Sequence, residues 1–381
     1  MKRFLPLLFV ICQAAAAQSW ISMNQGNYEI HSAADRPSTA VLAAELEQRF
    51  ETYNRLFRFE PAKLQSALKV RYFTDRDEYQ KYIGSRIREE SSAVEGAVYL
   101  HYSVPERREL VVLKGAESAM LPYQAFIQFF RAFVPNPPSW MREGFAVYFN
   151  SLKFNADTRT LEYEENLAWL DTVKKQLSAV SPRDVLLADS AGVPDNFHAL
   201  SWSVVSFFLT NRESSYFRTL TDSFMLLRED ATAEVNSKIV YDRLSLFTSI
   251  DAFESDYKTY IGSRKTFTEL VEEGQKAYEA KDFAAAVESF HEAVLLKPDS
   301  PVPFFYLGLI AYDQKEYDAA ERWYVTALNL GENPGLVQYA RGVNAAAAGR
   351  KADAGEFLRE AATASPEKYK ALADDLMARL K

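Results

Sequence analysis

The residue types that most often carry enzyme chemistry are sparse in this chain, and their spacing is unfavourable. Its four histidines are His31, His101, His198 and His291. No two of them stand three or four residues apart, so none shares a helical face with another, as paired metal-binding histidines do. Lone histidines are more often surface or hydrogen-bonded core residues than ligands. We therefore expect no metal site built from these side chains.

One short string matches a nucleophile pattern. Ser66 and Lys69 are spaced as in the Ser-x-x-Lys motif of serine acyl enzymes. The companion Ser-Asp-Asn and Lys-Thr-Gly strings are absent from the sequence, and Lys69 runs directly into a predicted strand. Neither a Gly-x-Ser-x-Gly string nor a phosphate-binding glycine loop occurs. We interpret the match as chance and assign no nucleophile.

The sharpest chemical feature is a single carboxylate in an apolar helical segment. Glu143 lies in a helix predicted to begin at Ser139, after a proline-rich turn, and another apolar helix is predicted upstream at Tyr123 to Phe133. Helical spacing places Glu143 beside Trp140 and Val147 on the inward face. A buried carboxylate without a partner is costly, so Glu143 requires an explanation.

The segment around Glu143 resembles the second metal-binding helix of the gluzincin zinc peptidases, especially the bacterial peptidase MA-like families of uncharacterised function. Its string is Trp140-x-x-Glu143-Gly144-x-Ala146-x-Tyr148-Phe149. In those families a preceding helix supplies His-Glu-x-x-His, whose histidines bind zinc while the glutamate activates water, and the later glutamate is the third ligand. The resemblance covers roughly residues 20 to 262, with weaker pattern matches at 27–31, 70–79, 201–208 and 252–260.

Three positions of the peptidase motif are altered here. The resemblance places Tyr123 at the first histidine, Gln124 at the general-base glutamate and Ile127 at the second histidine, and it leaves only Glu143, at the third ligand. One carboxylate cannot hold zinc, whose protein sites have three or four ligands, and a neutral amide is no general base. The resemblance therefore implies an inactive peptidase-type domain without metal, cofactor or catalytic residue. The alternative is a zinc metallopeptidase with an unrecognised ligand set.

Two explanations of Glu143 remain open. In the first, it hydrogen-bonds a neighbour such as Tyr123 or a backbone amide, as buried polar groups usually must. In the second, it belongs to a vestigial cleft that binds peptide without cutting it, and a tyrosine hydroxyl and an amide near the carboxylate would suit that role.

The elements that must position these residues follow from hydrophobic periodicity. The region from 18 to 262 is predicted to begin as α+β and then to become mostly helical. Its predicted elements are strands at 27–31 and 70–73, a β-hairpin from 97–101 and 110–113, and helices at 40–57 and 77–83.

The region from 263 to 381 carries a repeat with a fixed 34-residue period. Each repeat contributes one glycine and two alanines: Gly274, Ala286 and Ala293; Gly308, Ala320 and Ala327; Gly342, Ala354 and Ala361. Large residues share another column, namely Phe290, Tyr324 and Leu358. In a helix hairpin the small residues allow two backbones to approach, and the large residues fill the space between hairpins. We therefore predict an all-helical array.

This pattern resembles the tetratricopeptide repeat (TPR) over residues 268 to about 368, which implies three repeats forming a short α-solenoid. Glu332 departs from it, because the other two repeats have proline there, and Asn333-Pro334-Gly335 supply the turn instead. A capping helix is predicted after Glu367, with an apolar stripe of Tyr369, Leu372, Leu376 and Leu380. The resemblance implies binding of a peptide or protein segment, while a spacer or dimerisation role remains open.

The start of the chain has the pattern of a secretory signal peptide. Lys2 and Arg3 precede an apolar run from Phe4 to Cys12, and Ala17 follows at a small-x-small cleavage pattern. The run is shorter than the roughly 20 apolar residues of a membrane span. Cleavage near Ala17 would remove the single cysteine, and with it disulfides, thiolate metal sites and a cysteine nucleophile. We expect an exported protein, periplasmic or secreted, without a transmembrane segment.

The net charge of the chain argues against one class of partner. The formal charge of −8 becomes −10 when Lys2 and Arg3 are removed, which disfavours nucleic acid as a partner. The sequence thus predicts a signal peptide at 1–17, a gluzincin-like domain at 18–262, and three TPR repeats with a capping helix at 263–381. The predicted function is that of a non-catalytic interaction or scaffold protein whose array binds a protein or peptide partner of unknown identity.

Overall fold

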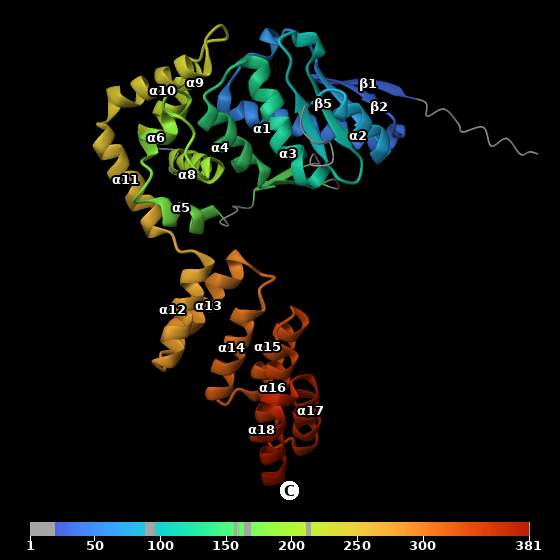
Figure 1. Cartoon of the computed structure of the whole chain (residues 1–381), viewed down its shortest axis with the longest axis vertical. Helices are drawn as coiled ribbons and strands as arrows, with labels where there is room; N and C mark the ends of the chain where they lie inside the picture. Colours follow the sequence, from blue (N-terminus) through green and yellow to red (C-terminus); the bar gives the residue numbers. More distant parts are fainter. Residues whose placement is uncertain are drawn as a thin grey trace, which may run out of the picture. The chain divides into compact units, whose positions relative to one another are not determined.

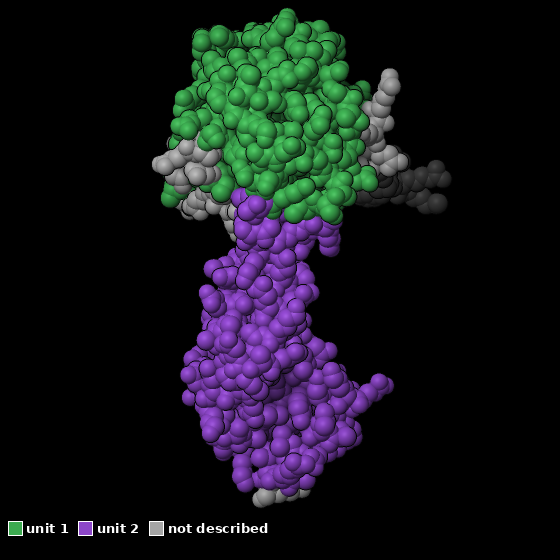
Figure 2. Space-filling model, turned by 90° about the vertical axis from the view of Figure 1, so that its left-hand side faces the viewer, with its two compact units in different colours: residues 1–166, 176–258 green, residues 167–175, 259–381 purple. Residues whose placement is uncertain are grey.

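The computed structural model of the chain describes residues 20–87, 96–155, 158, 160–163, 169–210 and 215–380. These residues form two compact units, shown in different colours in Figure 2. The first comprises the described parts of 1–166 and 176–258, and the second those of 167–175 and 259–381. The expected signal peptide at 1–17 lies outside the described residues. Within them, no helix combines the length and apolar character needed to cross a membrane.

The first unit begins with a five-stranded sheet in the order β1-β2-β3-β5-β4 (Figure 1). Its strands are β1 (Ile21–Gln25), β2 (Tyr28–Ser32), β3 (Leu68–Phe73), β4 (Ala97–Leu100) and β5 (Glu109–Leu113). The central strands β2, β3 and β5 are parallel, whereas β1 and β4 pair antiparallel at the two edges. The predicted β4–β5 hairpin is confirmed, with the short 3-10 helix Pro105–Arg107 in its connection.

Helices cover both faces of this sheet. On one face, α1 (Arg36–Phe57) and α3 (Glu117–Phe133) pack together, and aromatic residues such as Phe50 and Phe129 meet edge to face at 5.2 Å. On the other, α2 (Arg76–Gly84) buries Tyr79 and Ile83 in a smaller apolar cluster. The 3-10 helix Pro61–Lys63 precedes β3.

Two helices begin earlier than their apolar periodicity predicts. We expected α1 to start at Ala40, but it starts at Arg36 because the Asp35 carboxylate accepts a hydrogen bond from the Ser38 backbone N–H at 2.7 Å. We expected α3 to start at Tyr123, where its apolar run begins. It starts at Glu117 with Pro122 inside, because the tertiary packing of Leu121, which is 1% exposed, outweighs the lost backbone bond.

The rest of the first unit is mainly helical. Its helices are α4 (Ser139–Asn150), α6 (Pro182–Leu186), α7 (Ala188–Ala191), α8 (Phe197–Thr210), α9 (Ser215–Phe224) and α10 (Ala233–Phe247), followed by α11 (Ile250–Ser263), which runs past the unit's last residue. A two-stranded hairpin, β6 (Leu152–Asn155) with β7 (Thr160–Tyr163), was not predicted.

The second unit is built from helices alone in its described part. These are α5 (Leu170–Gln176) except its last residue, the end of α11, and α12 (Phe267–Glu279), α13 (Phe283–Leu296), α14 (Pro301–Asp313), α15 (Tyr317–Asn329), α16 (Pro334–Ala347), α17 (Lys351–Ala364) and α18 (Pro366–Arg379). Neighbouring helices pack as the pairs α12/α13, α14/α15 and α16/α17 (Figure 1). The expectation of an α+β region followed by an all-helical one is confirmed.

The last helix corrects one detail of the prediction. Helix α18 packs on α17, as a terminal helix should, and of the expected stripe Tyr369 is buried and Leu376 and Leu380 are half-buried, but Leu372 is not part of the buried face. Tyr369 and Ala373 are buried, whereas Leu372 is 48% exposed. The spacing of Tyr369 and Ala373 is i, i+4, which places them on one helical face, and a small alanine allows α18 to approach its neighbour more closely than leucine would.

Candidate functional site

Three helices of the first unit meet around Glu143. Tyr123 comes from α3, Arg142 and Glu143 come from α4, and His198 comes from α8. We refer to these four side chains as the Glu143 cluster. Two features of the fold decide their positions, namely the capping of α4 at its start and the close packing of α4 on α8.

The start of α4 is stabilised by a side chain from a distant helix. Pro138, the residue before the helix, has no side chain that can cap it. Asp189 of α7 instead accepts hydrogen bonds from the Ser139 backbone N–H at 2.9 Å and from the Ser139 hydroxyl at 2.5 Å. The Ser237 hydroxyl donates to the same carboxylate at 2.5 Å. A carboxylate here satisfies a free N–H and complements the positive end of the helix dipole.

The approach of α4 to α8 depends on Gly144. A Cβ atom at this position would lie 2.4 Å from the Ser201 carbonyl oxygen and 2.8 Å from Cγ2 of Val205. Only a residue without a side chain fits, so the two helices can pack backbone to backbone. Because Glu143 directly precedes this contact, it lies next to His198 on α8.

The Glu143 carboxylate is buried and has donors on both oxygens. Its side chain is 10% exposed. Arg142 Nε donates to Oε1 at 2.8 Å, while the Tyr123 hydroxyl donates to Oε2, and His198 Nδ1 lies 3.2 Å from Oε2. The expected hydrogen bond between Glu143 and Tyr123 is therefore confirmed.

Sequence reasoning missed two members of the Glu143 cluster. Arg142 and His198 were not predicted there, because one adjoins Glu143 in the chain without sharing its helical face and the other is distant in sequence. One signal pointed to His198. His198 stands about one helical turn before the stretch 201–208, whose pattern resembles the helix that supports the active site in the peptidase families.

These contacts fix the protonation states of the cluster. Burial acts to raise the pKa of Glu143, but hydrogen bonds from His198 and Tyr123 and the charge of Arg142 outweigh it and lower the pKa to about 2. Burial and the Glu143 charge raise the pKa of the Tyr123 hydroxyl. At neutral pH Glu143 is thus ionised and Tyr123 is a neutral donor. Since a general base needs a pKa near the working pH, this carboxylate is a poor proton acceptor.

The titration of His198 provides a direct test of the cluster. Its hydrogen bond with Glu143 raises the pKa of His198, against the opposing effect of burial. We expect the Glu143→Gln variant to return that pKa to about 6.5 or below, since burial and the Arg142 charge remain. NMR titration of the imidazole ring measures the change, with His198→Gln to assign the signal.

The sign of the linked stability follows from the raised pKa. The charged pair stabilises the fold fully below about pH 6.5, and its contribution is lost as the pH rises through the folded-state pKa of His198. Because the His198 side chain is 57% exposed, solvent screening limits this contribution to about 1 kcal/mol or less. An unchanged His198 titration in Glu143→Gln would contradict the assigned pairing.

The two remaining motif positions form no hydrogen bond within the Glu143 cluster. The Gln124 side chain accepts a hydrogen bond from the Tyr99 backbone N–H at 3.0 Å, on the edge strand β4. This bond satisfies an outward-facing donor of an edge strand. Ile127 is half-buried, and its apolar side chain offers no ligand atom. Of the four sequence-predicted positions, the structure therefore brings only Tyr123 and Glu143 into contact.

Two arginines, Arg142 and Arg131, lie close enough to Glu143 to interact with its charge. Burial, and then the charges of Arg131, Arg108 and Arg142, lower the pKa of His101 to about 4, so its ring is neutral at pH 7. Arg131 Nε is buried and has no hydrogen-bond partner among the described residues. The two positive charges of Arg142 and Arg131 near one ionised carboxylate disfavour a divalent cation, since like charges repel strongly where solvent is excluded.

The nine small residues of the repeat lie at helix contacts of the second unit. A Cβ at Gly274, Gly308 or Gly342 would lie 2.8, 2.5 or 2.7 Å from the nearest atom of Phe290, Tyr324 or Leu358, respectively. The six alanines of the pattern are fully buried: Ala286, Ala293, Ala320, Ala327, Ala354 and Ala361. These residues therefore determine packing and are not themselves contact residues for a partner.

Neither a metal cluster nor a relative identifies the site. Across the described ranges, no group of three or more His, Cys, Asp or Glu side chains is placed to hold a metal ion. No protein-family model matches the sequence, and no curated protein matches it either. The function therefore has to be argued from the geometry of the two units.

Proposed function

We propose that this chain is an exported, non-catalytic protein that binds a peptide or protein segment with a TPR array. In this proposal the first unit is a degenerate gluzincin-like domain, and the mature protein acts in the periplasm or outside the cell. The observation that carries the proposal is the threefold recurrence of one helix-pair contact, in which a glycine of the first helix faces a large side chain of the second.

When these helix pairs stack, the first helix of each pair lies next to the first helix of the following pair. Helix α12 contacts α14, α14 contacts α16, and α16 contacts α18. First helices that neighbour one another in this way form a continuous surface, which is where helical repeat proteins hold extended segments. Such a surface supports a binding role over a role as a simple spacer.

Half-buried tyrosines on the first helices give this surface suitable chemistry. Tyr278 on α12 and Tyr306 on α14 meet edge to face with ring centroids 5.9 Å apart. Tyr312 lies further along α14 and is also half-buried. Next to them, Lys281 forms an ion pair with Asp313 at 3.1 Å. Tyrosine offers apolar area and a hydroxyl at low entropic cost, which is why it is common at protein interfaces.

A peptide-binding experiment tests the array. We expect the full chain to select peptides from a random display library, and a selected peptide to bind Tyr312→Ala about tenfold more weakly, a change of about 1.4 kcal/mol. The matched control is Leu295→Ala, an apolar residue that is 82% exposed on the second helix α13. Equal affinities for all three proteins, or no selected peptide, would contradict the proposal.

The absence of catalysis is tested separately. We expect the purified chain to contain no stoichiometric zinc and to leave unstructured peptides uncut, because Tyr123 and Ile127 supply no zinc ligand and Glu143 is already bonded to three donors. Elemental analysis and a peptide cleavage assay measure this. Stoichiometric zinc with chelator-sensitive cleavage would favour the alternative of a metallopeptidase with another ligand set.

A restored motif provides the matched control. The variant with Tyr123→His, Gln124→Glu and Ile127→His returns two histidines to α3 and retains Glu143 as a third ligand. If the first unit is a gluzincin-type fold, this variant is expected to retain zinc through dialysis, because three protein ligands are sufficient. Failure of a folded variant to bind zinc would count against the gluzincin assignment without affecting the peptide-binding result.

A further inference from the structure

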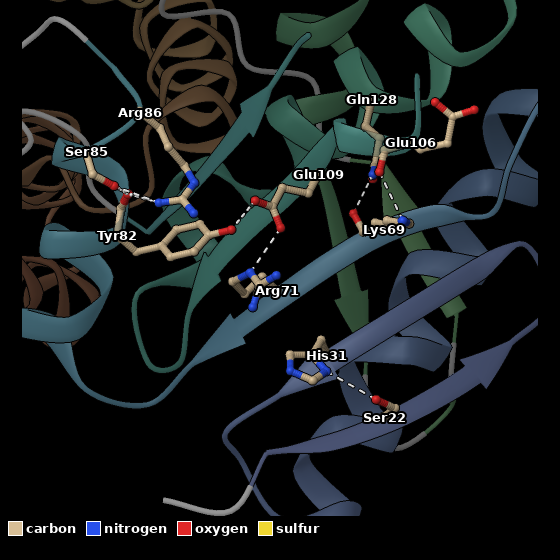
Figure 3. A network of polar contacts seen from close by, with 10 residues as sticks. All are labelled: Ser22, His31, Lys69, Arg71, Tyr82, Ser85, Arg86, Glu106, Glu109 and Gln128. Atoms are coloured by element: carbon tan, nitrogen blue, oxygen red, sulfur yellow. Dashed lines mark hydrogen bonds and ion pairs between the residues drawn. The ribbon is translucent and has the colours of Figure 1, made fainter. Parts of the chain in front are cut away.

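The sheet face opposite α1 and α3 carries a group of charged residues that the Glu143 cluster does not use. In β3 and β5, alternate side chains point to this face, and the register pairs Lys69 with Glu109. Arg71 is on the same face, next to Glu109 (Figure 3). One end of this face is covered by α2, and the charged residues lie where that cover ends.

The most buried group in this region is already neutralised within the protein. Glu109 is 9% exposed and accepts hydrogen bonds from Arg71 Nε at 3.0 Å and from the Tyr82 hydroxyl (Figure 3). Burial and the hydrogen bond to Glu109 raise the pKa of Tyr82 to about 12, so the hydroxyl remains a donor at neutral pH. Arg71 is therefore held in place by Nε and by the rings of Trp20 and Tyr82, and among the described residues no hydrogen bond engages its two terminal nitrogens.

A cavity of about 240 Å³ opens above this pair. Four cationic and two tyrosine side chains line it: Lys69, Arg71, Arg86, Arg107, Tyr82 and Tyr102. Among the residues that the structure describes, the acidic ones lining it are Glu106 and Glu109. Since Arg71 already neutralises Glu109, the lining keeps an excess of positive charge, although the whole chain has a formal charge of −8. A locally positive cavity on a chain with negative net charge favours an anionic ligand.

The arginines at the rim are ordered by contacts that leave donors free. Arg86 lies over the Tyr82 ring at 3.5 Å, and its Nη1 donates to the Tyr82 carbonyl oxygen at 2.9 Å and to the Ser85 hydroxyl at 2.7 Å (Figure 3). Arg107 lies over the Tyr102 ring at 5.3 Å. A guanidinium carries five N–H donors, so each arginine retains several that can reach a ligand.

We propose that this cavity binds a small dianionic oxyanion group, of the phosphate or sulfate type. Arginine forks match such groups because their paired N–H donors meet two oxygens at once. The volume lies below the roughly 300–1,000 Å³ typical of sites for drug-sized ligands, which fits a compact group. The site is separate from the proposed peptide-binding array and does not depend on it.

Calorimetric titration of the full chain with inorganic phosphate, and separately with sodium sulfate, tests the proposal at constant ionic strength. We expect saturable binding with a Kd of about 1 mM or lower. Arg86→Gln and Arg107→Gln are each expected to weaken binding about tenfold, since each removes a charge-assisted contact. Both residues are exposed, so these variants should fold, which circular dichroism verifies.

The matched control is Arg36→Gln, an exposed arginine of the same unit that does not line the cavity. It should bind both anions like the unmodified protein. Binding of phosphate or sulfate alone identifies which oxyanion the site prefers and supports the proposal. Absence of saturable binding, or an equal loss in Arg36→Gln, overturns it.

Discussion

Replacing Glu143 with alanine is expected to lower the free energy of unfolding by about 3 kcal/mol at pH 7, as when one partner of a buried ion pair is removed. The side chain is 10% exposed, and its loss leaves Arg142, His198 and the Tyr123 hydroxyl without their acceptor. Urea denaturation followed by tryptophan fluorescence measures the change, because Trp140 and Trp202 are buried close by in the same unit.

Glu143→Gln is the matched variant for this experiment. The amide retains the shape of the side chain and can still accept from Tyr123, so we expect a smaller loss, of about 1–2 kcal/mol. The pH dependence follows from the lowered pKa of Glu143. Its contribution is complete above about pH 4.5 and is lost as the pH falls toward the folded-state value of about 2. A constant difference between the two proteins over that range would disprove the electrostatic explanation.

Substitution of Gly144 by alanine is expected to destabilise the first unit by about 2 kcal/mol. The added methyl group meets the Ser201 carbonyl at 2.4 Å, and backbone atoms cannot move aside as a flexible side chain can. Overpacking of this kind costs typically about 1–3 kcal/mol, which outweighs the roughly 1 kcal/mol that alanine gains over glycine within a helix. Denaturation in urea measures the net change.

Gly355→Ala is the matched control, since it makes the same substitution inside helix α17. A Cβ at Gly355 would meet no atom within 4 Å. Helix propensity alone then acts, and we expect this variant to gain up to about 1 kcal/mol. If both variants were stabilised, α4 and α8 would not approach each other as closely as described, and the position of Glu143 beside His198 would be wrong as well.

The Glu143 cluster also explains why a buried carboxylate persists in an apolar helix. In the proposed gluzincin-like domain, Tyr123 occupies a ligand position and donates to the one retained acidic position. The hydroxyl, the Arg142 guanidinium and the His198 ring together supply the compensation that a buried charge requires. Under this proposal the first unit retains its fold without its chemistry, and binding is the activity that the rest of the chain supports.

The sequence by itself determined the local features of this protein. Alternation of apolar residues predicted the β4–β5 hairpin, and the fixed period predicted the helix pairs, because both patterns report which face of one element is buried. The departures of positions 123, 124 and 127 from the proposed peptidase motif could be read directly, since they concern residue identity alone. A hydrogen-bonded partner for Glu143 was also expected, with Tyr123 among the candidates, because helical spacing already placed the carboxylate inward.

Only the tertiary structure decided which distant residues meet. His198 reaches Glu143, Asp189 caps Ser139, and the described part of 167–175 belongs to the second unit, and no hydrophobic periodicity indicates any of these pairings. The charged cavity around Arg71 likewise combines two strands, a helix and a loop. Periodicity assigns a residue to a face but not to a neighbour across the fold. That pairing depends on how elements pack, and here on a single missing side chain at Gly144, which allows α8 to lie against α4.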